Sequence, residues 1–330
     1  MISLKNDEKL RLLYLCRILY EKTDENNELS TSQIMEILKE TYGISTYRTT
    51  LTRDIELLIQ AGMDIEVVRS RQNKYHLVSR PLDLPEPKLL IDAVASSKFI
   101  TAKKSGELIS SIMRLSGEPR ADELKRNIYF DENYKTDNEQ GYYIADTIND
   151  AINQGKKISF QTAEYNIRKE RILHNDGERY IFSPYALVWD GDFYYVVGYS
   201  EKHGNIGSHR VDRIWESPVI LDEAACPKPE GFDLTAYTHT MFRMYNSSRE
   251  KVELICEKSL MNTIIDRFGR NVEVHNFDDT HFIAAPTVAV NHIFYSWIFG
   301  FGGKVIIKGP ESVRLGYEDM VKSAAENIKK

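Results

Sequence analysis

The chain has 330 residues, of which 42% are hydrophobic and 28% are charged, and its formal net charge is −6 at pH 7. This composition is typical of a soluble protein with room for two or three domains. The net charge excludes a uniformly basic nucleic-acid-binding coat but allows a local basic face. Cys16, Cys226 and Cys256 form no CxxC or His-rich pattern, so neither a disulfide framework nor a metal site is expected. The sequence has no signal-peptide core and no apolar run long enough to span a bilayer, so we expect no membrane partner and a cytoplasmic location. We also expect no cofactor.

The N-terminal residues predict three helices. Apolar residues recur at helical spacing over 8–22, and Ser30 or Thr31 can cap a second helix that ends near Gly43. A third helix is expected between Ser45, its predicted N-cap, and Gly62, its predicted stop. One face of this helix carries Tyr47, Leu51, Ile55 and Leu58.

Two short β runs follow at 64–70 and 74–80, so residues 1–80 are predicted to be a winged helix-turn-helix. The outer face and flanks of the third helix suit the major groove of double-stranded DNA, while basic residues of the wing suit the phosphate backbone. The expected DNA contacts are Thr46, Tyr47, Arg48, Thr49, Thr50, Thr52 and Arg53 on the helix, and Arg71, Asn73 and Lys74 on the wing. The alternative is that these polar side chains only form the solvent-exposed face of an amphipathic helix and contact no DNA.

The run PLDLPEP at 81–87 breaks any helix and marks a domain boundary. Helical spacing resumes from Lys88 to about Arg126, so residues 81–140 are predicted to form a helical connector. This connector suits dimer contacts or the relay of a ligand signal, and a plain spacer is an equal alternative.

Residues 141–222 are predicted to be a leading helix and a small β-barrel. A strand is expected over 156–165, and the stretch 180–215 reads as a three-stranded meander with a tight turn at Asp190-Gly191. Polar side chains on these strands are expected to line an open face, because a small barrel buries charge only at a cost. They suit an anionic ligand, and they are Ser183, Tyr185, Tyr194, His209, Arg210 and Arg213.

Strand alternation limits how many of these six residues face together. His209 and Arg210 are adjacent and should point to opposite faces unless a bulge intervenes. On a continuous strand, Arg213 would point to the same face as His209. Alternatively, Arg213 has a purely structural role as the partner of Asp212 or Glu216.

This stretch resembles the WYL domain, an SH3-like β-barrel of bacterial transcriptional regulators. The resemblance is carried by Pro184, Leu187, Gly191, the triplet 193–195 and the run HRVDRI at 209–214, although the family's Trp-Tyr-Leu triplet keeps only its central Tyr194. The run RTTLTRD at 48–54 is similar to the recognition helix of such regulators, which implies that Asp54 is a structural partner for a basic group. The resemblance also implies a nucleotide or nucleic-acid-like effector.

After Arg213 we expect a linker rich in proline and acidic residues, and then a C-terminal α+β domain at 245–330. Its predicted order, β-α-β-β-α-β-α, indicates a small ferredoxin-like sheet, with one hairpin around Asp278-Asp279. This region is similar to the C-terminal extension that follows WYL barrels. The fold class is therefore predicted as multidomain α+β.

No Walker, HExxH or GxSxG motif is present, so the chain is predicted not to be an enzyme. The first function hypothesis is a homodimeric, ligand-responsive transcriptional regulator with sequence-specific DNA binding. The alternative is a nucleic-acid-binding accessory module that regulates a partner enzyme, for example in phage defence. Under the alternative, Thr46, Thr49 and Arg53 are replaceable without loss.

Overall fold

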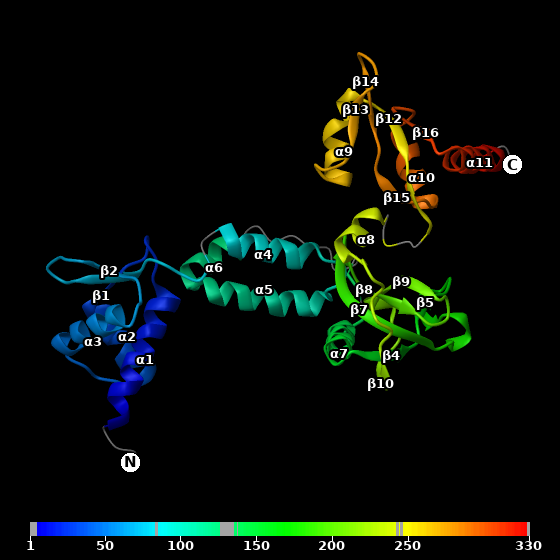
Figure 1. Ribbon diagram of the computed structural model, residues 1–330. Coiled ribbons are helices and arrows are strands. Elements are labelled where there is room, and N and C mark those ends of the chain that lie inside the picture. Colours follow the sequence, from blue (N-terminus) through cyan, green and yellow to red (C-terminus); the bar gives the residue numbers. More distant parts are fainter. Residues whose placement is uncertain are drawn as a thin grey trace. The chain divides into compact units, whose positions relative to one another are not determined.

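The protein is described from a computed structural model, which covers residues 5–82, 85–125, 135–136, 138–241, 244 and 247–328 (Figure 1). It is a mixed α+β protein with several sheets, as predicted, and it divides into two compact units, Met1–Glu139 and Gln140–Lys330. Among the described residues, no helix combines the length and apolarity needed to cross a membrane.

The first unit begins with three helices and a small sheet. The helices are α1 (Lys5–Lys22), α2 (Thr31–Tyr42) and α3 (Arg48–Gln60), and the strands β1 (Leu29–Ser30), β2 (Ile65–Val68) and β3 (Lys74–Leu77) pair in the order β1-β3-β2. Leu15, Leu19, Ile34, Leu51 and Tyr75 are fully or almost fully buried in their common core. The predicted limits of α2 are confirmed: Ser30 forms a capping box with Gln33, and Gly43 ends the helix with a φ of 70°.

The start of α3 differs from the prediction. Ser45 is not its N-cap, because the helix begins at Arg48 and the extended residue before it, Tyr47, caps it without a side-chain hydrogen bond. Because Tyr47 lies before the first helical residue, its side chain does not join the apolar face of α3, and it is 81% exposed. Leu51, Ile55 and Leu58 are buried as expected, and Gly62 lies just beyond the helix with a φ of 98°.

An ion pair joins α1 to α3. The Nε atom of Arg11 lies 2.5 Å from one carboxylate oxygen of Asp54, and its Nη2 lies 3.3 Å from the other. Asp54 is 5% exposed, and its hydrogen bond raises the pKa of Arg11 above the usual value. The prediction that Asp54 is the structural partner of a basic group is confirmed.

The connector contains α4 (Pro85–Ser96), α5 (Ala102–Ser116) and α6 (Glu118–Lys125). The helical pattern predicted for 88–126 is thus broken twice, and residues 126–134 and 137 of the predicted connector lie outside the described part of the chain. Contacts tie the connector to α1 and the residues that follow it: the Tyr20 hydroxyl donates to the Leu115 carbonyl at 2.8 Å, and Arg120 pairs with Glu25 at 2.9 Å.

In the second unit, α7 (Gly141–Gln154) leads into a five-stranded antiparallel sheet. Its strands are β4 (Lys156–Phe160), β7 (Tyr180–Asp190), β8 (Phe193–Ser200), β9 (Asn205–Arg210) and β10 (Val219–Ala224), in the order β10-β4-β7-β8-β9. The predicted meander is present, with its turn one residue later than expected because Asp190 pairs with Phe193. The predicted first strand ends at Phe160, and a separate hairpin of β5 (Ala163–Tyr165) and β6 (Arg171–Leu173) follows.

Two predictions for the end of this sheet are wrong. The third run does not continue as a strand through Arg213, because β9 ends at Arg210 and residues 211–213 form a 3₁₀ turn. The stretch after Arg213 is not merely a linker either. It contains β10, which pairs with β4, and α8 (Leu234–Thr240), whose surroundings pack on Tyr195 and Val197 of β8.

The C-terminal part contains β11 (Arg249–Lys251), β12 (Glu253–Glu257), α9 (Met261–Phe268), β13 (Val274–Asn276), β14 (His281–Ala284), β15 (Thr287–Ala289), α10 (His292–Phe299), β16 (Val305–Gly309) and α11 (Glu311–Ile328). These elements include the predicted order β-α-β-β-α-β-α together with two short strands that were not predicted, β11 and β15, which pair with each other in a separate sheet. Four strands form a sheet in the order β13-β14-β12-β16. Alternate residues, such as Leu254 and Cys256 of β12, pack with Ile264 of α9 and Phe294 of α10.

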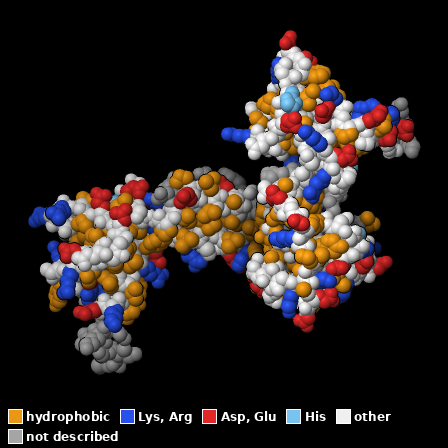
Figure 2. Space-filling model, viewed as in Figure 1, with side chains coloured by type: hydrophobic (Ala, Val, Ile, Leu, Met, Phe, Trp, Pro, Cys, Tyr) orange, Lys and Arg blue, Asp and Glu red, His pale blue; other side chains and the backbone are white. Residues whose placement is uncertain are grey.

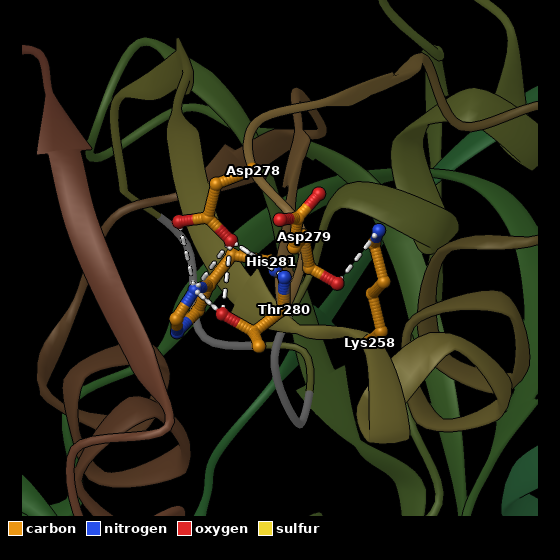
Figure 3. Close-up of polar contacts among 5 residues, drawn as sticks. All are labelled: Lys258, Asp278, Asp279, Thr280 and His281. Carbon is orange, nitrogen blue, oxygen red and sulfur yellow. Dashed lines mark hydrogen bonds and ion pairs between the residues drawn. The ribbon is translucent and has the colours of Figure 1, made fainter.

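The hairpin predicted around Asp278-Asp279 is confirmed between β13 and β14 (Figure 3). The Asp278 carboxylate accepts hydrogen bonds from the backbone N–H groups of Thr280 and His281, both at 2.7 Å. These bonds, led by that of Thr280, hold the pKa of Asp278 well below its usual range. Lys258 donates to the Asp279 carbonyl at 3.0 Å, so the turn is also fixed to the end of β12.

Replacement of Asp54 by alanine is expected to lower the free energy of unfolding by about 3 kcal/mol, because it leaves the guanidinium of Arg11 enclosed without its counter-charge. Denaturant titration of the full chain, followed by circular dichroism, measures this change. Asp92→Ala is the matched control, since Asp92 forms an exposed pair with Lys88 on α4 and its loss is expected to cost less than about 0.5 kcal/mol. Equal losses in the two variants would contradict a structural role for the Arg11–Asp54 pair.

Candidate functional site

One candidate site is the exposed side of α3. Arg48, Thr49 and Arg53 are exposed on this helix, and Tyr47 is exposed just before it. The guanidinium of Arg48 lies 3.4 Å from the Ser32 hydroxyl at the start of α2. Ser32 was not predicted, because its only signal is its position as the second residue of α2. The arrangement can present two guanidiniums and a hydroxyl to a nucleic-acid groove.

Three predicted threonines are less available than expected. The Thr46 hydroxyl is buried and has no hydrogen-bond partner among the described residues. Thr52 is partly buried and donates its hydroxyl to the Arg48 carbonyl at 3.0 Å. Thr50 is also partly buried. The exposed surface of α3 is therefore more basic than its sequence implies.

The wing residues differ in what they contact. Arg71 is exposed in the turn between β2 and β3. Asn73 uses its backbone carbonyl to accept a hydrogen bond from the Thr31 N–H at 3.0 Å, which fixes the wing to the start of α2. Lys74 lies 3.1 Å from Glu28, so a phosphate has to compete with that carboxylate for its ammonium group.

In the second unit, Ser183 and Tyr185 hold a later part of the chain against β7. The Ser183 hydroxyl accepts a hydrogen bond from the Cys226 N–H at 2.9 Å. The Tyr185 hydroxyl donates to the Pro227 carbonyl at 3.1 Å, and burial raises the pKa of Tyr185 to about 12. Both side chains are buried and serve the fold in this arrangement.

His209 lies among aromatic rings. Its ring centroid is 5.1 Å from those of Phe160 and Phe182 and 5.4 Å from that of Tyr180. Burial, reinforced by the nearby His203, lowers the pKa of His209 to about 4. The imidazole is therefore neutral at pH 7 and can offer an anion a hydrogen bond but no charge.

Arg210 points to the other face of the sheet, as strand alternation predicts. Its Nη2 lies 2.7 Å from Asp212, which is 8% exposed, and its guanidinium carbon lies 3.3 Å from the Phe193 ring centroid. Arg213 lies elsewhere, over the ring of Tyr165 at 5.1 Å. Asp212 thus pairs with Arg210 and not with Arg213.

The six predicted ligand residues do not form one patch. Tyr194 lies beside Trp189, with ring centroids 5.5 Å apart, and His209 is separated from Arg210 by the sheet itself. The expectation of an open face is wrong for the face that carries Tyr195 and Val197, because it is covered by the side chains of Phe232, Leu234, Tyr237, Met241 and Met244. Arg210 and Arg213 are the two predicted residues that keep a partly exposed cation. Phe193 and Tyr165 were not predicted as site residues, since their contacts with Arg210 and Arg213 join separate elements of the fold, and Asp212 was expected only as an alternative partner of Arg213.

Residues 143–219 match the model of the WYL domain. This segment runs from the third residue of α7 to the start of β10. The chain therefore contains a WYL domain, and the resemblance drawn from its sequence motifs is confirmed. No match was found among curated proteins.

Two solved structures show a distant similarity to this chain. One is proteasome accessory factor B/C (PafBC) of Arthrobacter aurescens, with 15% identity and a TM-score of 0.31 over 98% of this chain and 49% of that chain. This chain thus spans about half the length of that protein. The other is a CRISPR Cas-related protein, with 12% identity and a TM-score of 0.38 over 76% of this chain and 75% of that chain.

The buried, neutral His209 is expected to make stability depend on pH. In an unfolded chain a histidine has a pKa of about 6.5, so the unfolded state binds a proton before the folded state does as the pH falls. The free energy of unfolding is therefore expected to decrease by up to about 3 kcal/mol as the pH falls from 6.5 to 4. Denaturant titrations of the full chain across this pH range measure the loss.

His209→Phe is the matched variant, because it keeps an aromatic ring in the same surroundings and removes the titrating group. Its stability is expected to fall less steeply than that of the wild type between pH 6.5 and pH 4. Parallel profiles for the two proteins would show that His209 does not titrate with a lowered pKa.

Proposed function

We propose that this chain is a DNA-binding transcriptional regulator whose WYL domain binds an anionic, nucleotide-like or oligonucleotide effector. The observation that carries the proposal is the surface of α3. Its exposed Arg48 and Arg53 stand on a helix that is fixed to α1 by the Arg11–Asp54 pair. A rigid helix with outward guanidiniums is what sequence reading in a major groove requires.

The proposal assigns a role to each part of the chain. Residues 1–80 are a winged helix-turn-helix that reads DNA, and residues 81–140 are the connector. Residues 141–222 are an SH3-like sensor barrel, and residues 245–330 are a ferredoxin-like extension. The strand orders β1-β3-β2 and β13-β14-β12-β16 support the first and last of these assignments.

The proposed effector surface spans the turn after β9, with Arg210 just before the turn and Arg213 at its end, so an effector has to extend across the turn to contact both. Arg210 is held by Asp212, so an incoming phosphate has to take the guanidinium from that carboxylate. Because Asp212 lies in the 3₁₀ turn at the end of β9, this exchange changes the contacts of the turn. Such a change is a means of passing effector binding to the rest of the protein.

The proposed regulator is a homodimer, because one recognition helix makes few base contacts and paired half-sites double them. The connector has apolar surface available for this purpose. Leu89 and Leu90 of α4 are 66% and 44% exposed, and Leu115 of α5 is 52% exposed. Figure 2 shows hydrophobic side chains gathered over these two helices.

Selection of bound duplexes from a random pool by the full chain is expected to yield one sequence motif. On that duplex, Arg53→Ala should weaken binding by roughly 5- to 150-fold and relax specificity at one position, which corresponds to about 1–3 kcal/mol. Arg114→Ala, which removes an exposed cation from α5, is the matched control and should bind as the wild type does. Light scattering of the complex should find two chains for each site.

Recovery of no motif, or equal binding by the Arg53 and Arg114 variants, would refute the DNA-reading role. If oligonucleotide binding nevertheless persisted in the Arg53 variant, the result would favour the accessory module that regulates a partner enzyme.

The effector site is tested with nucleotides and short oligonucleotides titrated against the full chain. Arg213→Ala should weaken binding about 10-fold or more, because a hydrogen bond to a charged group contributes about 1.5–3 kcal/mol. Asp212→Asn should strengthen it, because the variant releases Arg210 from its carboxylate. If both variants bind with unchanged affinity, the effector binds elsewhere on the chain. If no protein binds any of these ligands, the proposed effector function is wrong.

A further inference from the structure

The β5–β6 hairpin, residues 163–173, interrupts the path from β4 to β7. Its tip is tightly hydrogen-bonded: the Asn166 side-chain oxygen accepts from the N–H groups of Arg168 at 2.9 Å and Glu170 at 3.0 Å. The Lys169 N–H returns to the Asn166 carbonyl at 2.9 Å, and Lys169 takes a φ of 64°. The backbone of the tip is therefore fixed by its own hydrogen bonds.

This ordered tip presents apolar and basic groups together. Ile167 is fully exposed, at 101%, and Tyr165 is 46% exposed. The next two residues, Arg168 and Lys169, are exposed as well. A single exposed isoleucine is unremarkable by itself. Here it stands beside an aromatic ring and two cations on a rigid turn, and this combination is typical of a nucleic-acid contact.

The acidic residues of the hairpin already have partners. Glu164 lies 2.7 Å from the His174 ring, and Glu170 accepts from the Asn166 side-chain amide at 2.8 Å. These carboxylates are thus turned to contacts within the protein. The cations at the tip, Arg168 and Lys169, are exposed and form a positive surface that faces solvent.

The base of the hairpin is joined to the end of the WYL motif. The Trp215 N–H donates to the Gln161 carbonyl at 2.9 Å, and Arg171 donates to the Ile214 carbonyl at 2.5 Å. The guanidinium of Arg171 lies 5.1 Å from the Trp215 ring centroid. Arg213 lies at the same distance from the Tyr165 ring. Because Tyr165 and Arg171 are register partners across the hairpin, the two guanidinium–aromatic pairs are neighbours close to its tip.

We propose that the β5–β6 hairpin is a second contact for a single-stranded oligonucleotide. Bases stack on Tyr165 and Trp215, and phosphates bind Arg168 and Lys169 at the tip. The inference rests on the proposed effector function and deepens it, because it makes the effector a strand of several nucleotides rather than a mononucleotide. Arg213 is the shared residue, since it belongs to the effector site and lies on the hairpin's Tyr165.

The test uses the full chain and a fluorescently labelled oligothymidylate of about 12 nucleotides, a length within the range that single-strand-binding modules cover. The double variant Arg168→Ala/Lys169→Ala should bind it more weakly. Its plot of log affinity against log salt should be shallower by about 1.4, or about 0.7 for each lost phosphate contact. Tyr165→Ala should weaken binding roughly 10-fold through lost stacking.

The control is Arg270→Ala/Lys322→Ala, which removes two exposed cations from the C-terminal part and changes the net charge equally. It should bind and depend on salt as the wild type does. A thymidine mononucleotide is the second probe, and its affinity should not change in the tip variant.

Three outcomes would overturn the hairpin contact. If the wild type binds the oligonucleotide and the tip variant binds it equally with the same salt dependence, the hairpin contact is wrong and the effector function stands. If tip and control variants lose affinity alike, net charge alone explains the loss. If the wild type binds neither probe, both the hairpin contact and the effector function fail. In each case a protein or duplex partner for Ile167 becomes the better explanation.

Discussion

The five-stranded sheet of the WYL domain has apolar side chains on both faces, and both faces have to be covered. Val196 and Phe182 are buried with no exposed area, and so is Val197, which points the opposite way from Val196. Residues after β10 supply the second cover, held by Ser183 and Tyr185 through the backbone of residues 226–227. This constraint decides which polar groups of the sheet reach solvent. It leaves Arg213 of the turn after β9 partly exposed, and Arg168 and Lys169 of the β5–β6 hairpin fully outside these covers.

A comparable constraint fixes the N-terminal reading surface. The wing and α2 share hydrogen bonds, since the N–H and the hydroxyl of Thr31 both bond to the Asn73 carbonyl. The helix α3 is attached to α1 by Arg11 and Asp54. The proposed recognition helix and wing are therefore parts of one packed body, which would keep base contacts and phosphate contacts in a fixed relation. Positioning of this kind is needed for specificity, because loosely held cations supply affinity without sequence information.

Local signals in the sequence predicted the elements, and long-range contacts decided the sites. The capping box at Ser30, the hairpin at Asp278 and the opposite directions of His209 and Arg210 follow from short-range rules, and all three are present. The strand β10 was missed because its partner β4 is distant in sequence and its neighbours are prolines and acidic residues. Arg213 was placed on a strand because the 3₁₀ turn has no signal of its own. The partner of Arg210 was missed for the same reason, since that turn brings Asp212 to it.

The two proposed sites share one feature: in each of them a cation is already paired with a carboxylate of the protein. Lys74 is paired with Glu28, and Arg210 is paired with Asp212. An anion that binds either cation has to break an existing pair, so the net gain is the difference between two similar interactions. A polyanion overcomes this cost by making several contacts on one chain, whereas a single phosphate makes only one exchange. Under the proposed function, the paired cations would discriminate against small anions and would let a protein of net charge −6 bind nucleic acid selectively.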